Sequence, residues 1–191
     1  MFTRHWSPTR VFVLSTGRCG STTFIRACDH LTNYTSGHET RAARVGERRF
    51  DYPERHIESD NRLSWMLGEL GRRFDPKQTL YVHLTRDREE VARSFLKRFD
   101  NPSRAGIITA FSHAIVMHRR DWAPRQQIDL CRFYVDVVTS NIEAFLEHQP
   151  HTHAVRLETA DTDFPRFLSM IRAEGDLEAA QGEWRVRHNA S

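Results

Sequence analysis

The sequence predicts an α/β protein with a central parallel sheet that is covered by helices. Short runs of β-branched and aromatic residues recur along the chain, and segments with a helical apolar stripe lie between them. Polar, glycine-containing loops follow directly after two of these runs. Strands that alternate with helices are joined by crossovers, so they lie parallel and leave helices on both faces of the sheet.

The first half of the chain opens with a strand, a loop and a helix. The strand is expected over residues 10–14, and the loop that follows contains Gly17 and Gly20. A helix is expected to begin near Ser21 and to continue to about residue 28. A second short strand is expected near residues 33–36. The polar stretch from residue 37 to about 60 reads as a long functional loop with some helix.

The second half continues the alternation of strands and helices. Because no linker rich in Pro, Gly or Ser divides it, we expect a single domain over residues 1–191. Capping and breaking residues, such as Asp87 before one helix and Pro76 after another, set the limits. The expected elements are helix 61–74, strand 79–85, helix 87–98, helices 105–120 and 126–148, strand 152–157 and helix 164–172.

The charge balance excludes several partners. The 191 residues carry 28 Lys and Arg against 25 Asp and Glu, a net charge of +3, with no basic stripe interleaved with aromatic residues. We therefore expect no nucleic-acid partner. Only Lys77 and Lys97 are lysines, and the arginines that make up the rest suit two-pronged binding of phosphate or sulfate. Apolar runs are too short for a membrane span, and charges near the N-terminus argue against a signal peptide, so we expect a cytoplasmic protein.

The cysteines and histidines do not form a metal pattern. The chain has three widely spaced cysteines, Cys19, Cys28 and Cys131, and none lies in a C-x-x-C spacing. Histidines cluster at residues 148–153 without an acidic or cysteine ligand at metal spacing. We therefore expect no disulfide framework and no metal site.

Residues 15–23 have the composition of a phosphate cradle. Gly17 and Gly20 allow backbone N–H groups to turn toward an anion, and the helix that begins near Ser21 adds its positive end. Thr22 and Thr23 add hydroxyl donors, and Arg18 is the cation. The loop is not a Walker A motif, because it lacks the lysine and the four residues between glycines.

A second polar pair follows the most apolar strand. Arg86 stands at the carboxyl end of strand 79–85, and Ser94 lies eight residues later in the next helix. The carboxyl ends of parallel strands lie at one edge of the sheet, where such folds bind ligands. Both side chains are thus expected near the first cradle.

Together the two motifs resemble the sulfotransferases that depend on 3′-phosphoadenosine 5′-phosphosulfate (PAPS). The resemblance is in particular to their bacterial, carbohydrate-type branch. That family has a P-loop-like three-layer fold with a central parallel sheet. It binds the 5′-phosphosulfate with a strand–loop–helix of the form (K/R)-x-G-(S/T)-(S/T), and the 3′-phosphate with an Arg and a Ser eight residues later. The resemblance implies PAPS as co-substrate, without a metal. The matching residues are Arg18, Cys19, Gly20, Ser21, Thr22 and Thr23 in the first motif and Arg86 and Ser94 in the second.

The resemblance also implies a general base and a C-terminal nucleotide contact. The segment Gly37-His38-Glu39 matches a Gly-His-x-Glu-like motif that supplies a glutamate base, although it is shorter, so Glu39 and His38 both stay candidates. The tail that includes Arg185 and Arg187 resembles the family's basic closing segment. Arg41, Asn61 and Arg62 are candidate contacts to the acceptor, a small molecule or carbohydrate hydroxyl.

Two other functions share these features. A small-molecule or nucleotide kinase of the P-loop class would open with the same strand, loop and helix, but it would need a Lys-Ser/Thr pair and an acidic Mg²⁺ partner. A catalytically inactive protein that binds PAPS or the desulfated nucleotide, adenosine 3′,5′-bisphosphate (PAP), would keep the cradle and lose the base. The sequence leaves the acceptor and the oligomeric state open.

Overall fold

The computed structural model describes residues 6–99, 101–118 and 122–186, and its centre is a five-stranded parallel sheet. The strand order is β2-β3-β1-β4-β5. The chain therefore places β2 and β3 on one side of β1 and then β4 and β5 on the other. Neighbouring strands all pair in parallel. The strands are β1 (Arg10–Leu14), β2 (Thr35–His38), β3 (His56–Ser59), β4 (Thr79–Thr85) and β5 (Thr152–Arg156).

The two inner strands β1 and β4 form the middle of the core. Both are runs of buried side chains, as expected for strands that are covered on both faces. In the pairing register Val13 lies opposite Ser59 of β3 and Val82 of β4. The carboxyl ends of β1, β3 and β4 therefore meet at one edge of the sheet, and the loops that follow them share that edge.

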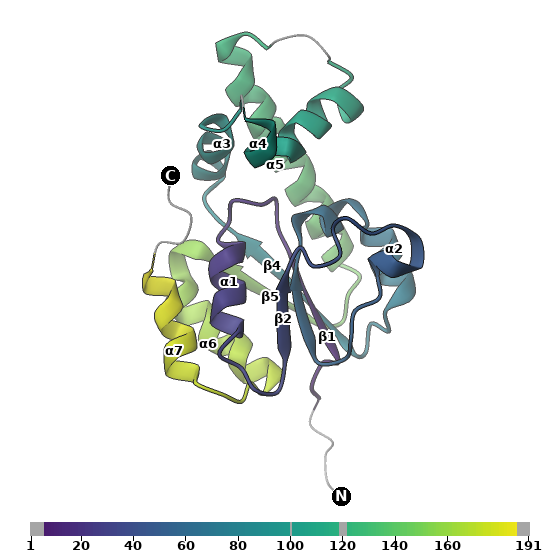
Figure 1. The fold of residues 1–191 in the computed structure, drawn as a ribbon, viewed down its shortest axis with the longest axis vertical. Coiled ribbons are helices and arrows are strands. Elements are labelled where there is room, and N and C mark those ends of the chain that lie inside the picture. Colours follow the sequence, from purple (N-terminus) through teal and green to yellow (C-terminus); the bar gives the residue numbers. More distant parts are fainter. Residues whose placement is uncertain (1–5, 100, 119–121, 187–191) are drawn as a thin grey trace, which may run out of the picture.

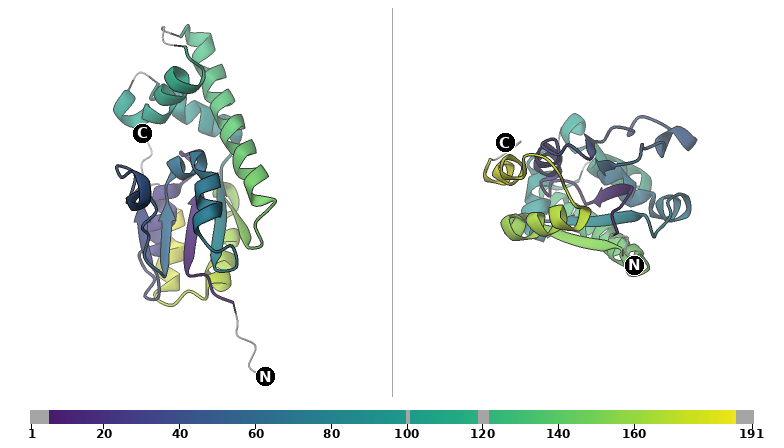
Figure 2. Two further views of the ribbon diagram at one scale, coloured as in Figure 1. Left: turned by 90° about the vertical axis from the view of Figure 1, so that its right-hand side faces the viewer. Right: turned by 90° about the horizontal axis from the view of Figure 1, so that it is seen from below.

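Helices cover both faces of the sheet, which gives three layers (Figures 1 and 2). Phe24 of α1 packs on Phe164 and Phe167 of α6 on one face. On the other face Phe145 of α5 packs on Tyr81 of β4. The first face carries α1 (Ser21–Cys28), α6 (Ala160–Ile171) and α7 (Leu177–Gly182), and the second carries α2 (Leu67–Arg73) and α5 (Pro124–Leu146).

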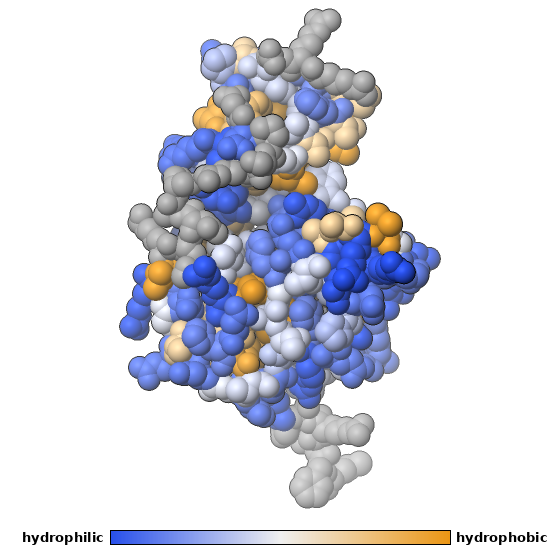
Figure 3. Space-filling view, in the orientation of Figure 1, coloured by the Kyte–Doolittle hydropathy of each residue, from blue (hydrophilic) through white to orange (hydrophobic). Residues whose placement is uncertain are grey.

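A helical arm extends beyond the carboxyl edge of the sheet (Figure 2, left). It consists of α3 (Arg88–Leu96), α4 (Pro102–Ala110), the π-helical turn η3 (Phe111–Ile115) and the first turns of α5. The arm stands over the edge at which the candidate loops lie. Figure 3 shows that the face drawn in Figure 1 is largely hydrophilic, and exposed apolar side chains of the arm include Ile115, Met117 and Phe133.

The alternation of strands and helices is as expected, but several limits differ. The stretch 37–60 contains β3, whose polar residues gave no strand signal. The second strand lies at 35–38 instead of 33–36. The expected helix 61–74 is divided into a 3₁₀ turn, η2 (Asn61–Trp65), and α2, and the expected helix 105–120 corresponds to α4 and η3, which end at Ile115. Helix α6 begins at Ala160 instead of residue 164, and α7 and the 3₁₀ turn η5 (Glu183–Arg185) were not expected.

Within these described ranges, no helix combines the length and apolarity that a membrane span requires. The same part of the chain contains no group of three or more His, Cys, Asp or Glu side chains that could hold a metal ion. All three cysteines are buried as free thiols.

Candidate functional site

The loop between β1 and α1 folds into a tight cradle. Gly17, Arg18 and Gly20 have φ angles of 83°, 62° and 94°, and this left-handed backbone is available at low cost only to glycine. Gly20 is the N-cap of α1, so the free N–H groups of the first helical turn open at the cradle. Two hydrogen bonds hold the loop in place. The Gly17 N–H donates to Ser15 Oγ (3.1 Å), and the Tyr134 hydroxyl donates to the Thr16 carbonyl (2.8 Å).

Cys19 contributes only backbone to this cradle. Its side chain is 2 % exposed, and its Sγ lies 3.2 Å from Thr16 Oγ1. Burial raises the pKa of the Cys19 thiol to about 11, so the thiol is protonated at neutral pH and is not a nucleophile.

The cradle and the second polar pair meet through one hydrogen bond. Arg18 Nε donates to Ser94 Oγ over 3.1 Å, although the two residues are 76 positions apart. Arg98, four residues after Ser94 in the turn that follows α3, donates to the same hydroxyl over 3.2 Å. Burial, together with the like charges of Arg98 and Arg86, lowers the pKa of Arg18 from its usual value. Two guanidinium groups thus share one serine hydroxyl, and the charge of Arg86 acts on one of them, Arg18.

Arg86 has one carboxylate partner at this cluster. Its Nη2 lies 3.2 Å from Glu90 Oε2, and the Arg86 side chain is 28 % exposed. Asp87 caps α3 by accepting from the Glu90 N–H (2.9 Å), and the Asp87 N–H donates to Glu158 (2.8 Å). The start of α3 is therefore held firmly beside β5, and Arg86 is directed to the carboxyl edge of the sheet.

The candidate base residues lie at the neighbouring strand end. His38 Nε2 lies 2.9 Å from Ser21 Oγ in the first turn of α1. Glu39 follows in a left-handed conformation, with φ 56°, and its carboxylate pairs with Arg62 Nη1 at 2.7 Å. The structure thus places His38 against the cradle and Glu39 in an ion pair with a predicted acceptor contact.

Asn61 also lies at the cradle. A Cβ atom on Gly17 would come within 2.7 Å of Asn61 Nδ2, so the carboxamide lies directly over the loop and requires a glycine there. The Asn61 Oδ1 atom is buried and has no hydrogen-bond partner. Arg41 makes its hydrogen bond within its own loop, where its Nε donates to the Asp51 carbonyl (3.1 Å).

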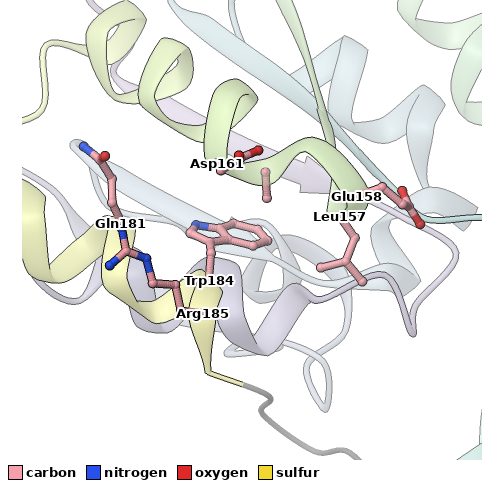
Figure 4. Close-up of a pocket in the computed structure, with 7 residues that line it drawn as sticks. Leu157, Glu158, Asp161, Gln181, Trp184 and Arg185 are labelled. Atoms are coloured by element: carbon pink, nitrogen blue, oxygen red, sulfur yellow. The ribbon is translucent and has the colours of Figure 1, made fainter.

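A pocket of about 310 Å³ lies on the other side of the cradle, between α6 and the C-terminal segment. Figure 4 shows Trp184 at its centre, with Leu157 and Glu158 on one side and Gln181 and Arg185 on the other. A Cβ atom on Gly20 would lie 3.0 Å from Leu157 Cδ1, so this pocket adjoins the start of α1. The Trp184 indole Nε1 is buried without a hydrogen-bond partner. Arg187, the other predicted tail contact, lies outside the described residues.

A larger groove of about 860 Å³ begins at the same edge and runs between α5 and β5. Arg86, Thr16 and Cys19 lie at its upper end. Its floor includes His83, which is 9 % exposed, and burial lowers the pKa of His83 to about 4. The imidazole is therefore neutral at physiological pH.

Some residues of the candidate site were not predicted from the sequence. Arg98 is four residues after Ser94, a spacing that places two side chains on the same face of a helix, so it could have been inferred once α3 was expected. Glu58 and Asp60 lie in and just after β3 and are fully buried. Their polar sequence gave no burial signal.

Comparisons with known proteins support the fold. No family model and no curated protein matches the sequence. Among solved structures, the chain is similar to a sulfotransferase domain from the curacin biosynthetic pathway, with a TM-score of 0.61 and 11 % sequence identity. The match covers 91 % of this chain and 77 % of that chain. The chain therefore has the P-loop-like, three-layer α/β fold of a sulfotransferase domain, as the motifs predicted.

Proposed function

We propose that this protein is a PAPS-dependent sulfotransferase that transfers a sulfuryl group to an acceptor hydroxyl. The observation that carries the proposal is the Arg18–Ser94 hydrogen bond of 3.1 Å, which joins the two sequence motifs in one place. The guanidinium groups of Arg86 and Arg98 belong to the same cluster. A site of this kind suits a ligand with two anionic groups.

The residues present fit the two ends of the nucleotide. The backbone N–H groups of the cradle and the hydroxyls of Ser21, Thr22 and Thr23 would hold the 5′-phosphosulfate. Arg86 and Ser94 would hold the 3′-phosphate, and Arg98 adds a second cation to that end. This division leaves the adenine for the pocket beside α1.

The Trp184 pocket has the chemistry of an adenine site. The indole offers an aromatic face, and Glu158, Asp161 and Gln181 at its rim offer oxygen acceptors to the exocyclic amine. The unpartnered Trp184 Nε1 offers a donor to a ring nitrogen. Arg185 lines the same pocket and, with Arg187, would close over the nucleotide.

The chemistry requires little from the protein beyond position and charge. The acceptor oxygen forms a bond to sulfur as the bond from sulfur to the bridging phosphate oxygen breaks, and PAP leaves. Negative charge grows on the bridging and sulfuryl oxygens, where Arg18 and the amides of Gly20, Ser21 and Thr22 stabilise it. The acceptor proton passes to Glu39 or His38, which both lie at this edge of the sheet.

The acceptor is a hydroxyl of a small molecule or carbohydrate in this proposal. Asn61 offers its unpartnered Oδ1 beside the cradle, and Arg62 offers a half-exposed guanidinium that is paired with Glu39. Arg41 lies in the adjacent loop. Polar contacts of this type orient a polyhydroxylated acceptor by its oxygens.

The nucleotide assignment is tested by calorimetry without Mg²⁺. We expect PAP to bind with micromolar or tighter affinity, and Arg86→Ala and Ser94→Ala to weaken binding by more than about tenfold, because each removes a charged hydrogen bond worth ~1.5–3 kcal/mol. Arg72→Ala, which removes an exposed arginine of α2, is the matched control and should leave the affinity unchanged. Equal affinity for ATP and PAP would refute the assignment and favour the kinase reading.

The base is tested separately with two variants. Glu39→Gln should keep the PAP affinity and lower turnover by about 10²-fold, within the range of general-base catalysis. Labelled PAPS and a panel of hydroxyl acceptors provide the turnover assay. Unchanged turnover in this variant, with a large loss in His38→Gln, would assign the proton to His38 instead. Intact PAP binding without transfer to any acceptor would indicate an inactive nucleotide-binding protein.

A further inference from the structure

A fully buried carboxylate lies behind the candidate base turn. Glu58 of β3 is 0 % exposed, and both of its oxygens are engaged. Its Oε1 accepts from the Thr40 N–H (2.7 Å) and its Oε2 from the Thr40 hydroxyl (2.7 Å). His56 Nε2 lies 3.0 Å from the same Oε2. Glu58 thus holds the residue that follows Glu39 by two separate hydrogen bonds.

The turn is shaped to receive this carboxylate. A Cβ atom on Gly37 would lie 2.3 Å from Thr40 Cγ2 and 3.0 Å from Glu58 Oε2, so the glycine of β2 provides the space in which Thr40 folds back. Between them Glu39 has a φ of 56°, and its N–H donates to the Ser59 carbonyl (3.0 Å). A non-glycine residue adopts this left-handed backbone only where its surroundings hold it.

A second buried carboxylate holds the other member of the Glu39–Arg62 ion pair. Asp60 is 0 % exposed and accepts from the Arg62 N–H (2.8 Å). Arg49 Nη2 pairs with Asp60 from the opposite side at 2.6 Å. Two carboxylates, one in β3 and one directly after it, therefore fix the backbone of Thr40 and the backbone of Arg62.

Burying a carboxylate is energetically costly. A buried ion pair or carboxylate loses its hydration and often adds nothing to stability over apolar residues of the same size. Here each carboxylate accepts a backbone N–H from a turn that carries a candidate functional side chain. A geometric role explains why polar residues occupy a buried strand.

We propose that Glu58 is a positioning residue that, through Thr40, sets the direction of the Glu39 carboxylate and of the neighbouring His38. This inference rests on the proposed function, because it gives the 38–40 turn a role in proton transfer. Glu58 does not touch the nucleotide cradle in this arrangement. It is therefore expected to affect turnover without affecting nucleotide affinity.

The test compares two nearly isosteric substitutions at an exposed residue, so that folding is preserved. Thr40→Val removes the hydroxyl bond to Glu58, and Thr40→Ser keeps it. Glu58→Gln removes the charge of the acceptor itself. Tyr52→Phe is the matched control, because it removes the Arg49 Nη1–Tyr52 hydrogen bond (2.8 Å) in the same buried network without contacting the turn.

Three measurements separate the outcomes. PAP affinity is measured by calorimetry, turnover of labelled PAPS gives kcat and KM, and hydrogen exchange reports protection of the Thr40 N–H. We expect Thr40→Val and Glu58→Gln to lose at least tenfold in kcat, since misplacement by about 1 Å can cost ~10²-fold. Their PAP affinity should stay within twofold of that of the wild type. Thr40→Ser should recover most of kcat, and exchange at residue 40 should accelerate in Glu58→Gln.

Two results would overturn the inference. One is a kcat for Thr40→Val within twofold of the wild type while PAP still binds. The other is an equal loss of kcat in Tyr52→Phe, which would mean that the network acts only through stability. Failure of the wild type to bind PAP would instead count against the proposed function, and the exchange measurement would still show whether Glu58 holds the turn.

Discussion

His83 makes the protein sensitive to acid, and the size of the effect can be worked out from its burial. The imidazole lies on β4 at the floor of the groove and is 9 % exposed. Burial lowers its pKa from the usual 6.5 to about 4, because the charged form loses its hydration. The pKa of His83 is therefore roughly 2.5 lower in the folded than in the unfolded state. At about 1.4 kcal/mol for each pKa unit, this changes the free energy of unfolding by roughly 3 kcal/mol.

The sign of the effect follows from which state binds the proton. Below about pH 6.5 the unfolded chain protonates His83, whereas the folded protein does not until about pH 4. Stability is therefore complete above about pH 6.5 and falls as the pH decreases to about 4, with no further loss below that value. Other titrating groups add their own slopes, so the contribution of His83 is a difference between two proteins.

The perturbation is His83→Leu, which fills a similar volume and removes the titrating group. Urea denaturation, followed by tryptophan fluorescence at several pH values between about 7 and 4, gives the free energy of unfolding of each protein. We expect the wild type to lose roughly 3 kcal/mol more than His83→Leu across this interval. Ile171→Val, a destabilised variant without an ionisable change, should keep the wild-type slope. Parallel curves for the wild type and His83→Leu would refute the reasoning.

Three further predictions concern the site. Gly37→Ala should lower the free energy of unfolding by about 1–3 kcal/mol in urea denaturation and also lower PAPS turnover, because the added methyl group meets Thr40 at 2.3 Å. Trp184→Leu should weaken PAP binding by about tenfold in calorimetry, since stacking on a base is worth ~1–3 kcal/mol, and unchanged affinity would remove the adenine from that pocket. PAP affinity should fall several-fold when salt is raised from about 0.05 to about 0.5 M, because the arginine cluster is partly open to solvent; a salt-independent affinity would argue against it.

The fold was predictable where apolar residues recur at the spacing of a strand or helix. Strand 79–85 is a continuous apolar run, and β4 has the same limits. β3 was missed because His56, Glu58 and Ser59 are polar and yet fully covered. The hydrogen bonds of His56 and Glu58 go to Thr35 of β2 and to Thr40 in the turn that follows β2. The local sequence pattern does not indicate such a hydrogen-bond partner, so it does not predict that these polar residues are buried.

The place of the candidate site in the fold was predictable to the extent that it consists of loops at strand ends. The cradle and the Arg86–Ser94 pair follow β1 and β4 in the sequence, and parallel strands bring such ends together. Arg98 and the Trp184 pocket depend on how α3 and the C-terminal turn pack against those loops. The sequence therefore identified the residues at the edge but not the contacts that unite them.

The crowding of arginines explains why an anion would bind here. Burial lowers the pKa of Arg18, and the like charges of Arg98 and Arg86 lower it further. Ser94 offers Arg18 and Arg98 an uncharged oxygen. The carboxylate of Glu90 pairs with Arg86 at the half-exposed side of the cluster. A nucleotide with anionic groups at both ends would give these cations negatively charged partners and would relieve repulsion that the fold tolerates without it. Because this gain depends on charge, the cluster should favour a nucleotide with a second phosphate over one whose ribose is unmodified. PAP and ATP differ in this way, and the proposed function depends on that distinction.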